Sequence, residues 1–212
     1  SVGVLRRMYE LGVRMMTLTW NHENELASLQ RTPGGVLVPQ TEKGLTGKGF
    51  EFLAEMERMH MIVDVSHLSD KGFWDIVEHG TRPFAASHSN CRALAPHTRN
   101  LTDEMIRALS ERGGIAGLNY YAPFLDTDPT HPENCRSTVE LIAKHAGHYK
   151  QVGGAQMIAL GSDFDGIDGP HQLENAAFLP LLADALRKED FTEDEVEGIY
   201  YRNAMRFFEE NL

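Results

Sequence analysis

The 212-residue sequence has only two cysteines and a shortage of positive charge, and both shortages exclude classes of protein. Cys91 and Cys135 are too few for a disulfide framework and form no C-x-x-C pair, so a reducing compartment, the cytoplasm, is the simplest prediction. The formal net charge of −11 argues against nucleic acid and anionic membrane surfaces as partners, because both require a cationic face. No apolar run reaches the roughly 18 residues that a membrane span needs.

Apolar segments of strand length alternate with segments of helical periodicity along the sequence. Strands are expected at residues 14–20, 61–66, 83–87, 114–119 and 156–161, and helices at 1–11, 49–60, 70–79, 102–111 and 137–151. The C-terminal part is expected to be helical, with a capping box formed by Thr192 and Glu195. This alternation predicts an α/β fold with a parallel sheet. No expected strand is followed by G-x-G-x-x-G, and no G-x-x-x-x-G-K-[ST] occurs, which argues against nucleotide-binding folds.

Two successive strands of this pattern end in a Ser-His pair, at His67 and His88. In a (β/α)8 barrel the carboxyl ends of the strands carry the chemistry, and neighbouring parallel strands lie about 5 Å apart. We therefore expect the two imidazoles to converge and to share a metal ion. Zinc suits neutral imidazole, and bound zinc activates water for attack. The alternative is a pair of histidines bonded to backbone.

Two further residues are candidates for the chemistry at the same strand ends. Asp163 ends the last expected strand, where a carboxylate would take a proton from water and pass it to a leaving amine. Asp165 and Asp168 are assigned instead to a turn. In the loop that follows His88, Arg99 is the better of two arginines for holding a substrate carboxylate bidentately, the alternative being a solvated charge.

A second pair of histidines, His145 and His148, lies on an expected helix with the i,i+3 spacing that permits metal chelation. Because this helix is expected on the outside of the barrel, a solvated face is the preferred interpretation.

Six segments, taken in order, resemble the membrane (renal-type) dipeptidases, zinc metallopeptidases of the amidohydrolase-like barrel class. They are G-V-L-R-R-M-Y-E-L-G-V-R-M-M-T-L-T-W, D-V-S-H-L-S, F-A-A-S-H-S-N, T-R-N-L-T-D-E, H-A-G-H-Y-K-Q-V-G-G and A-L-G-S-D-F-D-G. The resemblance covers essentially the whole sequence and implies a (β/α)8 barrel of the TIM type with a two-zinc site that hydrolyses dipeptides, often with a D-residue at the C-terminal position. It also implies that His67 and His88 bind one zinc, that Asp163 is the acid/base and that Arg99 holds the substrate carboxylate.

The sequence departs from the family pattern in two places. Trp20 stands where the family has a substrate-contacting histidine, and His22 is the candidate replacement. No H-x-D occurs, and no strand supplies the bridging glutamate, so ligands for only one zinc are evident. The sequence thus resembles the last five βα units of the barrel. We expect residues 1–212 to form a single partial-barrel domain whose N-terminal strands are missing from this chain.

Three functions remain open from the sequence. The first is a zinc dipeptidase of bacterial cytoplasm, of which this chain is a fragment, with a dipeptide as substrate and with no nucleic acid or membrane as partner. The second is a catalytically impaired remnant that binds peptide or pairs with a partner chain, as a homodimer or with a chain that supplies the missing strands. The third is a one-metal amidohydrolase that acts on another amide or on a lactam.

Overall fold

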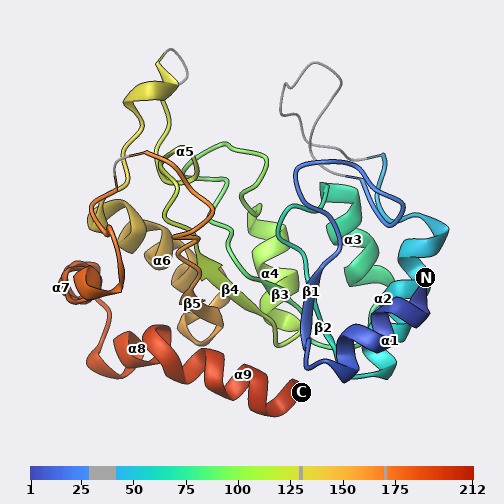
Figure 1. Ribbon diagram of the computed structural model, residues 1–212. Coiled ribbons are helices and arrows are strands. Elements are labelled where there is room, and N and C mark those ends of the chain that lie inside the picture. The colour runs from blue at the N-terminus through green and yellow to red at the C-terminus, as the bar shows by residue number, and fades with distance from the viewer. Residues whose placement is uncertain (29–41, 129–130, 170) are drawn as a thin grey trace. The chain divides into compact units, whose positions relative to one another are not determined.

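The computed structural model describes residues 1–28, 42–128, 131–169 and 171–212, in which helices alternate with short parallel strands (Figure 1). The chain divides into two compact units. The first unit comprises Ser1–Ala86 and Phe208–Leu212, and the second comprises Ser87–Phe207. Both units contain parallel strands joined through helices, which confirms the predicted α/β class.

The first unit contains three parallel strands, with β2 paired to β1 and to β3. Its elements are α1 (Val2–Glu10), β1 (Met15–Thr17), α2 (Gly47–Arg58), β2 (Ile62–Asp64), α3 (Asp70–His79) and β3 (Ala85–Ala86). Helix α3 has the predicted bounds because Ser69 caps it, its hydroxyl accepting a hydrogen bond from the N–H of Gly72.

The second unit contains the parallel pair β4 (Ile115–Leu118) and β5 (Ile158–Leu160). Its helices are α4 (Asp103–Glu111), α5 (Ala122–Leu125), α6 (Val139–Gly153), α7 (Leu179–Lys188), α8 (Glu193–Glu197) and the π-helical turn η4 (Gly198–Arg202). Helix α9 (Asn203–Asn211) begins in this unit and ends in the first. The predicted capping box at the start of α8 is confirmed by reciprocal hydrogen bonds between Thr192 and Glu195.

The polar residues predicted at strand ends do follow the carboxyl ends of strands. His67 comes three residues after β2, and His88 comes two residues after β3. Asn119 directly follows β4, and Asp163 comes three residues after β5. The strands themselves are shorter than predicted, because the backbone pairing ends before these residues.

Each unit buries its own apolar side chains. In the first unit the buried residues include Leu5, Met56, Val63, Phe73 and Phe84. In the second they include Ile106, Leu118, Ile142, Ile158 and Leu186. In the part of the chain that the structure describes, every helix is too short or too polar to cross a lipid bilayer.

Candidate metal and substrate site

His88 begins the part of the site that lies in the second unit, and its neighbour Ser87 sets the orientation of its ring. The Oγ of Ser87 lies 2.6 Å from Nδ1 of His88. When Nδ1–H donates to this hydroxyl, the lone pair is on Nε2, the nitrogen that would bind a metal. The Ser87 backbone is closely surrounded, since a Cβ on Gly117 or Gly161 would come within 2.1 Å of its carbonyl oxygen. Both positions therefore require glycine.

His67 lies in the first unit, half-buried, in a turn with a φ of 73°. Such a φ is uncommon outside glycine, and among the described residues it recurs at His60, Asp163 and Asp190. His60 and Asp190 follow α2 and α7, where a left-handed residue is the usual helix ending. His67 and Asp163 follow strands instead. The unusual backbone at these two predicted site residues is typical of functional sites.

His67 belongs to the first unit and His88 to the second. Their predicted convergence on one metal ion stays a prediction.

Asp163 is half-buried, and its carboxylate is oriented by Asn119. The Nδ2 of Asn119 donates to Oδ2 of Asp163 across 3.1 Å. The other carboxylate oxygen, Oδ1, would lie 2.2 Å from a Cβ at Gly166, so glycine at that position leaves Oδ1 accessible. Asn119 received no role from the sequence, although it directly follows a strand.

Arg99 is half-buried and lies beside His88 in the second unit. Its Nη2 is 3.5 Å from the carbonyl oxygen of His88, and its guanidinium carbon is 5.2 Å from the ring centroid of Phe124. A cation over an aromatic face is attracted to it. Two of the predicted site residues of the second unit, Arg99 and His88, are therefore neighbours.

His97, two residues before Arg99, forms one wall of a pocket next to this arginine. Its Nδ1 accepts the backbone N–H of Arg99 across 3.1 Å, and its ring packs on Phe124 with centroids 4.6 Å apart. Burial, with the positive charge of Arg99, lowers the pKa of His97 to about 4. The pocket is lined by Pro96, His97, Pro123, Asp126, Thr127, Asp128 and Cys135.

His22 lies in the first unit and is exposed to solvent. Its ring contacts the edge of Trp20, with centroids 6.2 Å apart, and Trp20 is itself 64% exposed. A substrate contact by His22 stays a prediction.

The prediction of a solvated histidine pair on α6 is wrong for His145. This residue is only 1% exposed; its Nδ1 accepts the N–H of Cys91, and its Nε2 donates to the carbonyl of Leu125. Burial lowers the pKa of His145 to about 4, so its role is that of a neutral link between loops. Nε2 of His148 lies 2.7 Å from a carboxylate oxygen of Asp103.

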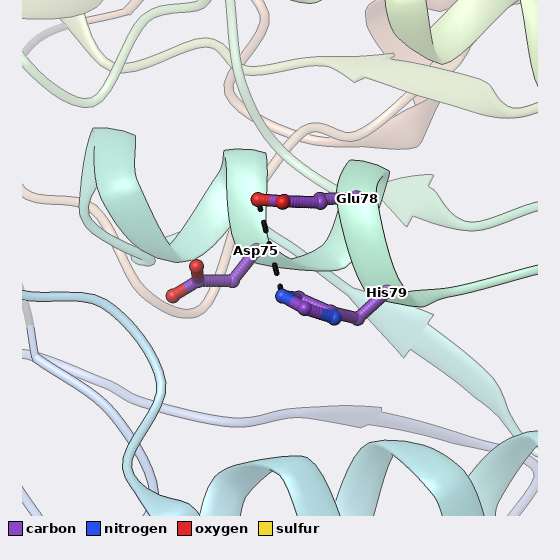
Figure 2. A group of neighbouring side chains, drawn as sticks. All are labelled: Asp75, Glu78 and His79. Atoms are coloured by element: carbon purple, nitrogen blue, oxygen red, sulfur yellow. Dashed lines mark ion pairs between the residues drawn. The ribbon is translucent and has the colours of Figure 1, made fainter.

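A separate cluster on α3 has ligand-type atoms within 4.8 Å of one another: Asp75, Glu78 and His79 (Figure 2). Within the described ranges it is the one group of three or more His, Cys, Asp or Glu residues that close together. The carboxylate of Asp75 already accepts the N–H of Leu45 and pairs with the ammonium of Lys71. That positive charge opposes a second cation, and the cluster includes neither His67 nor His88.

Parallel strands with polar residues after their carboxyl ends are the arrangement found in barrel-type α/β enzymes. The model of the family described as membrane dipeptidase (peptidase family M19) matches residues 1–211, and the chain belongs to this family.

Relatives and solved structures agree with this assignment. An uncharacterised protein encoded 5′ of pqqA in Klebsiella pneumoniae is 36% identical over 204 residues, which cover 95% of this chain and 73% of that protein. An uncharacterised dipeptidase of Schizosaccharomyces pombe is 35% identical over 208 residues, covering 97% of this chain and 48% of that protein.

Among solved structures, a metallo peptidase from Rhodobacter sphaeroides, liganded with a phosphinate mimic of the dipeptide L-Ala-D-Ala, superposes with a TM-score of 0.87 at 28% identity. The match covers 99% of this chain and 59% of that one. A metallo peptidase of family M19, the dipeptidase AC, gives a TM-score of 0.86 at 31% identity, covering 98% of this chain and 59% of that one. The chain thus spans roughly half to three quarters of the length of these proteins.

Proposed function

We propose that this chain is part of a zinc-dependent dipeptidase that hydrolyses the peptide bond of dipeptides, including those with a C-terminal D-residue. In this proposal His67 and His88 bind a zinc ion, Asp163 carries the proton and Arg99 holds the free carboxylate of the substrate. His22 is the candidate for a further substrate contact.

The observation that carries the proposal is the family match over residues 1–211. The position of Arg99 beside His88 supports the assignment of substrate and metal contacts to one place in the second unit. The Rhodobacter sphaeroides structure, with its mimic of L-Ala-D-Ala, supports a dipeptide with a C-terminal D-residue as the substrate to be tested first.

The chemistry of the donor set fits zinc in part. The Nε2 of His88, with Nδ1 held by Ser87, is an imidazole nitrogen of the kind that zinc prefers. Catalytic zinc usually has three protein ligands. In the described ranges, the one compact group of three ligand-type residues includes neither His67 nor His88, so these two histidines are the only ligands assigned in this proposal. Zinc, when bound, would polarise the scissile carbonyl and lower the pKa of a water molecule.

The residues of the second unit have separable roles in this reaction. The planar guanidinium of Arg99, packed on Phe124, is suited to bidentate hydrogen bonds with the substrate carboxylate. Oδ2 of Asp163 accepts from Asn119, so Oδ1 is the oxygen that would take a proton from the attacking water. The same oxygen would then return the proton to the departing amide nitrogen.

The experiment is an assay of L-Ala-D-Ala hydrolysis by the zinc-loaded complete enzyme, in which the missing strands accompany this chain, with zinc measured by plasma mass spectrometry. Arg99→Leu is expected to raise KM at least ~10-fold, because a charged hydrogen-bonding partner of the substrate is lost. Asp163→Asn is expected to lower kcat at least ~100-fold. Arg107→Leu, which changes an exposed arginine on α4, is the matched control and should leave both constants unchanged. A complete, zinc-loaded enzyme with no turnover of dipeptides contradicts the proposal.

A peptide-binding protein without catalysis is the second candidate, and the incomplete ligand set favours it. It predicts that the protein binds a dipeptide in calorimetry but releases no amino acids at any zinc concentration. A one-metal amidohydrolase instead predicts one zinc per chain, with turnover of a lactam or of a non-peptide amide.

We further propose that the remaining strands of the barrel and the ligands of the second zinc come from residues outside this chain, either a longer polypeptide or a partner chain. The coverage of only 48% and 59% of related proteins supports this. A single partial-barrel domain over residues 1–212, an association as a homodimer and a location in bacterial cytoplasm also stay proposals. The intact mass of the native protein and its oligomeric state in solution test the first two points.

A further inference from the structure

Asn119 has the most constrained side chain at the carboxyl end of β4. It is fully buried, and its Oδ1 accepts the backbone N–H of Tyr121 across 2.6 Å. Because that N–H is only a donor, the amide oxygen must face Tyr121. The NH2 group must then face Asp163, where it lies 3.1 Å from Oδ2. The amide therefore presents a donor to the carboxylate in one fixed orientation.

The backbone of Asn119 is fixed by a second asparagine. The side chain of Asn90 accepts the N–H of Asn119 across 3.0 Å and donates to its carbonyl across 2.9 Å. The backbone N–H of Asn90 donates in turn to Oδ1 of Asn100, and both side chains donate to the carbonyl of Phe124. All three asparagines are at most 1% exposed. Satisfied buried networks of this kind make a site rigid.

The carboxylate of Asp163 requires a hydrogen-bond donor that fixes its orientation. Its backbone φ of 64° lies in the left-handed region, and its side chain is only half-buried on a turn. A half-buried carboxylate on a turn has several rotamers, and only some of them direct Oδ1 toward a substrate. The bond from Asn119 selects among these rotamers.

We propose that Asn119 is a positioning residue for the proton carrier, acting through Asp163. Its amide holds Oδ2, so Oδ1 is directed to the reacting atoms, and the Asn90–Asn100 pair keeps that amide in place. This inference rests on the proposed peptidase function. It assigns to Asn119 an effect on the proton-transfer step and none on the binding of the substrate carboxylate.

The test measures kcat and KM for L-Ala-D-Ala with the complete zinc-loaded enzyme, which includes the missing strands, and with two variants of it. Asn119→Ala removes the donor. Asn119→Asp keeps the shape and the acceptor for Tyr121 and places an oxygen against Asp163, so it is a second, independent way of removing the donor. We expect both to lower kcat by ~10- to 100-fold, the effect of losing one hydrogen bond to a charged group, with KM within ~3-fold.

The matched control is Asn203→Ala. The amide of Asn203 donates to the carbonyls of Ala155 and Ile158, at the amino end of β5. Its replacement by alanine therefore removes two side-chain hydrogen bonds, as Asn119→Ala does, but neither of them involves Asp163. We expect its thermal stability to fall as that of Asn119→Ala does, with kcat within ~2-fold of wild type.

Three results overturn the inference. The first is an equal loss of kcat in Asn119→Ala and Asn203→Ala, which would make the role merely structural. The second is a folded Asn119→Asp with wild-type kcat. The third is a loss confined to KM. A complete wild-type enzyme without turnover overturns the peptidase proposal itself, and this result is distinct from the other three.

Discussion

Burial separates the histidines of this chain into different chemical roles. His97 and His145 are neutral in the folded protein, because burial lowers the pKa of each to about 4. The ring of His145 joins the backbone of Cys91 to that of Leu125 at the end of α5, and Nδ1 of His97 accepts the N–H of Arg99 in its own loop. His67 and His88 instead follow strand ends in half-buried turns, where an imidazole is accessible to a ligand. The second pair is therefore the one proposed as metal ligands.

The buried His145 predicts how stability depends on pH. Its pKa is about 4 in the folded chain and about 6.5 when unfolded, so between these values the unfolded chain alone is protonated. The free energy of unfolding should therefore fall as the pH drops below about 6.5, by about 2 kcal/mol from this residue between pH 7.5 and pH 5. In His145→Gln, which keeps a donor and an acceptor, urea unfolding should show a decline smaller by that amount. An unchanged decline would contradict a neutral, buried His145.

The hydrogen bond between the Ser87 hydroxyl and His88 leads to a prediction about the affinity of the protein for zinc. Without its Oγ, Nδ1 of His88 loses the partner that sets the tautomer and the ring orientation. Loss of such a partner typically weakens metal binding 10- to 100-fold, so Ser87→Ala should raise the zinc Kd by at least ~10-fold in chelator competition. Ser110→Ala removes a hydroxyl that donates to the carbonyl of Gly153 and is the matched control. Equal Kd values for the two variants would contradict a role of the Ser87 hydroxyl in zinc binding.

The places of His67, His88 and Asp163 after strands were predictable from the sequence, whereas the side-chain partner of Asp163 was not. The positions of His67, His88 and Asp163 after strands follow from strand periodicity and residue type. Asn119 acts on Asp163, which is 44 residues away in the sequence, and no local pattern encodes that bond. For His145, helical spacing alone failed, because a helix outside a sheet still has one face buried against its neighbours.

At the scale of elements, helix positions followed the sequence more closely than strand lengths did. Side-chain caps fix the first turns, as Thr102 does for α4 and Thr192 for α8. The residue at which a strand ends depends on hydrogen bonding to the neighbouring strands, so it cannot be predicted from the sequence of that strand alone. The short α5 was not predicted, since four residues show no periodicity.

Close approach to the backbone makes Gly117 in β4 a sensitive position. A Cβ there would lie 2.1 Å from the carbonyl oxygen of Ser87 and 2.9 Å from the Cα of Gly161, and neither atom belongs to a flexible side chain. Gly117→Ala should therefore lower the free energy of unfolding by more than about 2 kcal/mol. In Gly3→Ala, within α1, the nearest atom is 3.7 Å away, and the variant should be as stable as wild type or up to about 1 kcal/mol more stable. Similar urea midpoints for the two variants would contradict the close approach.

At the scale of the whole molecule, family membership and completeness are separate questions. The family match runs over residues 1–211, whereas the chain covers 59% of the Rhodobacter sphaeroides peptidase and 48% of the Schizosaccharomyces pombe dipeptidase. A barrel closes only when its strand number and stagger agree, and five described strands fall short of eight. The absence of an H-x-D pair and of a bridging glutamate led to the same expectation from the sequence, and the incompleteness of the barrel stays a prediction.

The last prediction concerns the metal content of the 212-residue chain alone. With His67 and His88 as its only assigned ligands, the isolated chain should bind at most one zinc and leave L-Ala-D-Ala intact. A longer form, or the chain mixed with a segment that supplies the missing strands, should bind two zinc ions per molecule and hydrolyse the dipeptide. Plasma mass spectrometry of the dialysed proteins and a ninhydrin assay measure both properties, and a chelator should abolish turnover reversibly. Full turnover by the 212-residue chain with two bound zinc ions would show that its own residues complete the site.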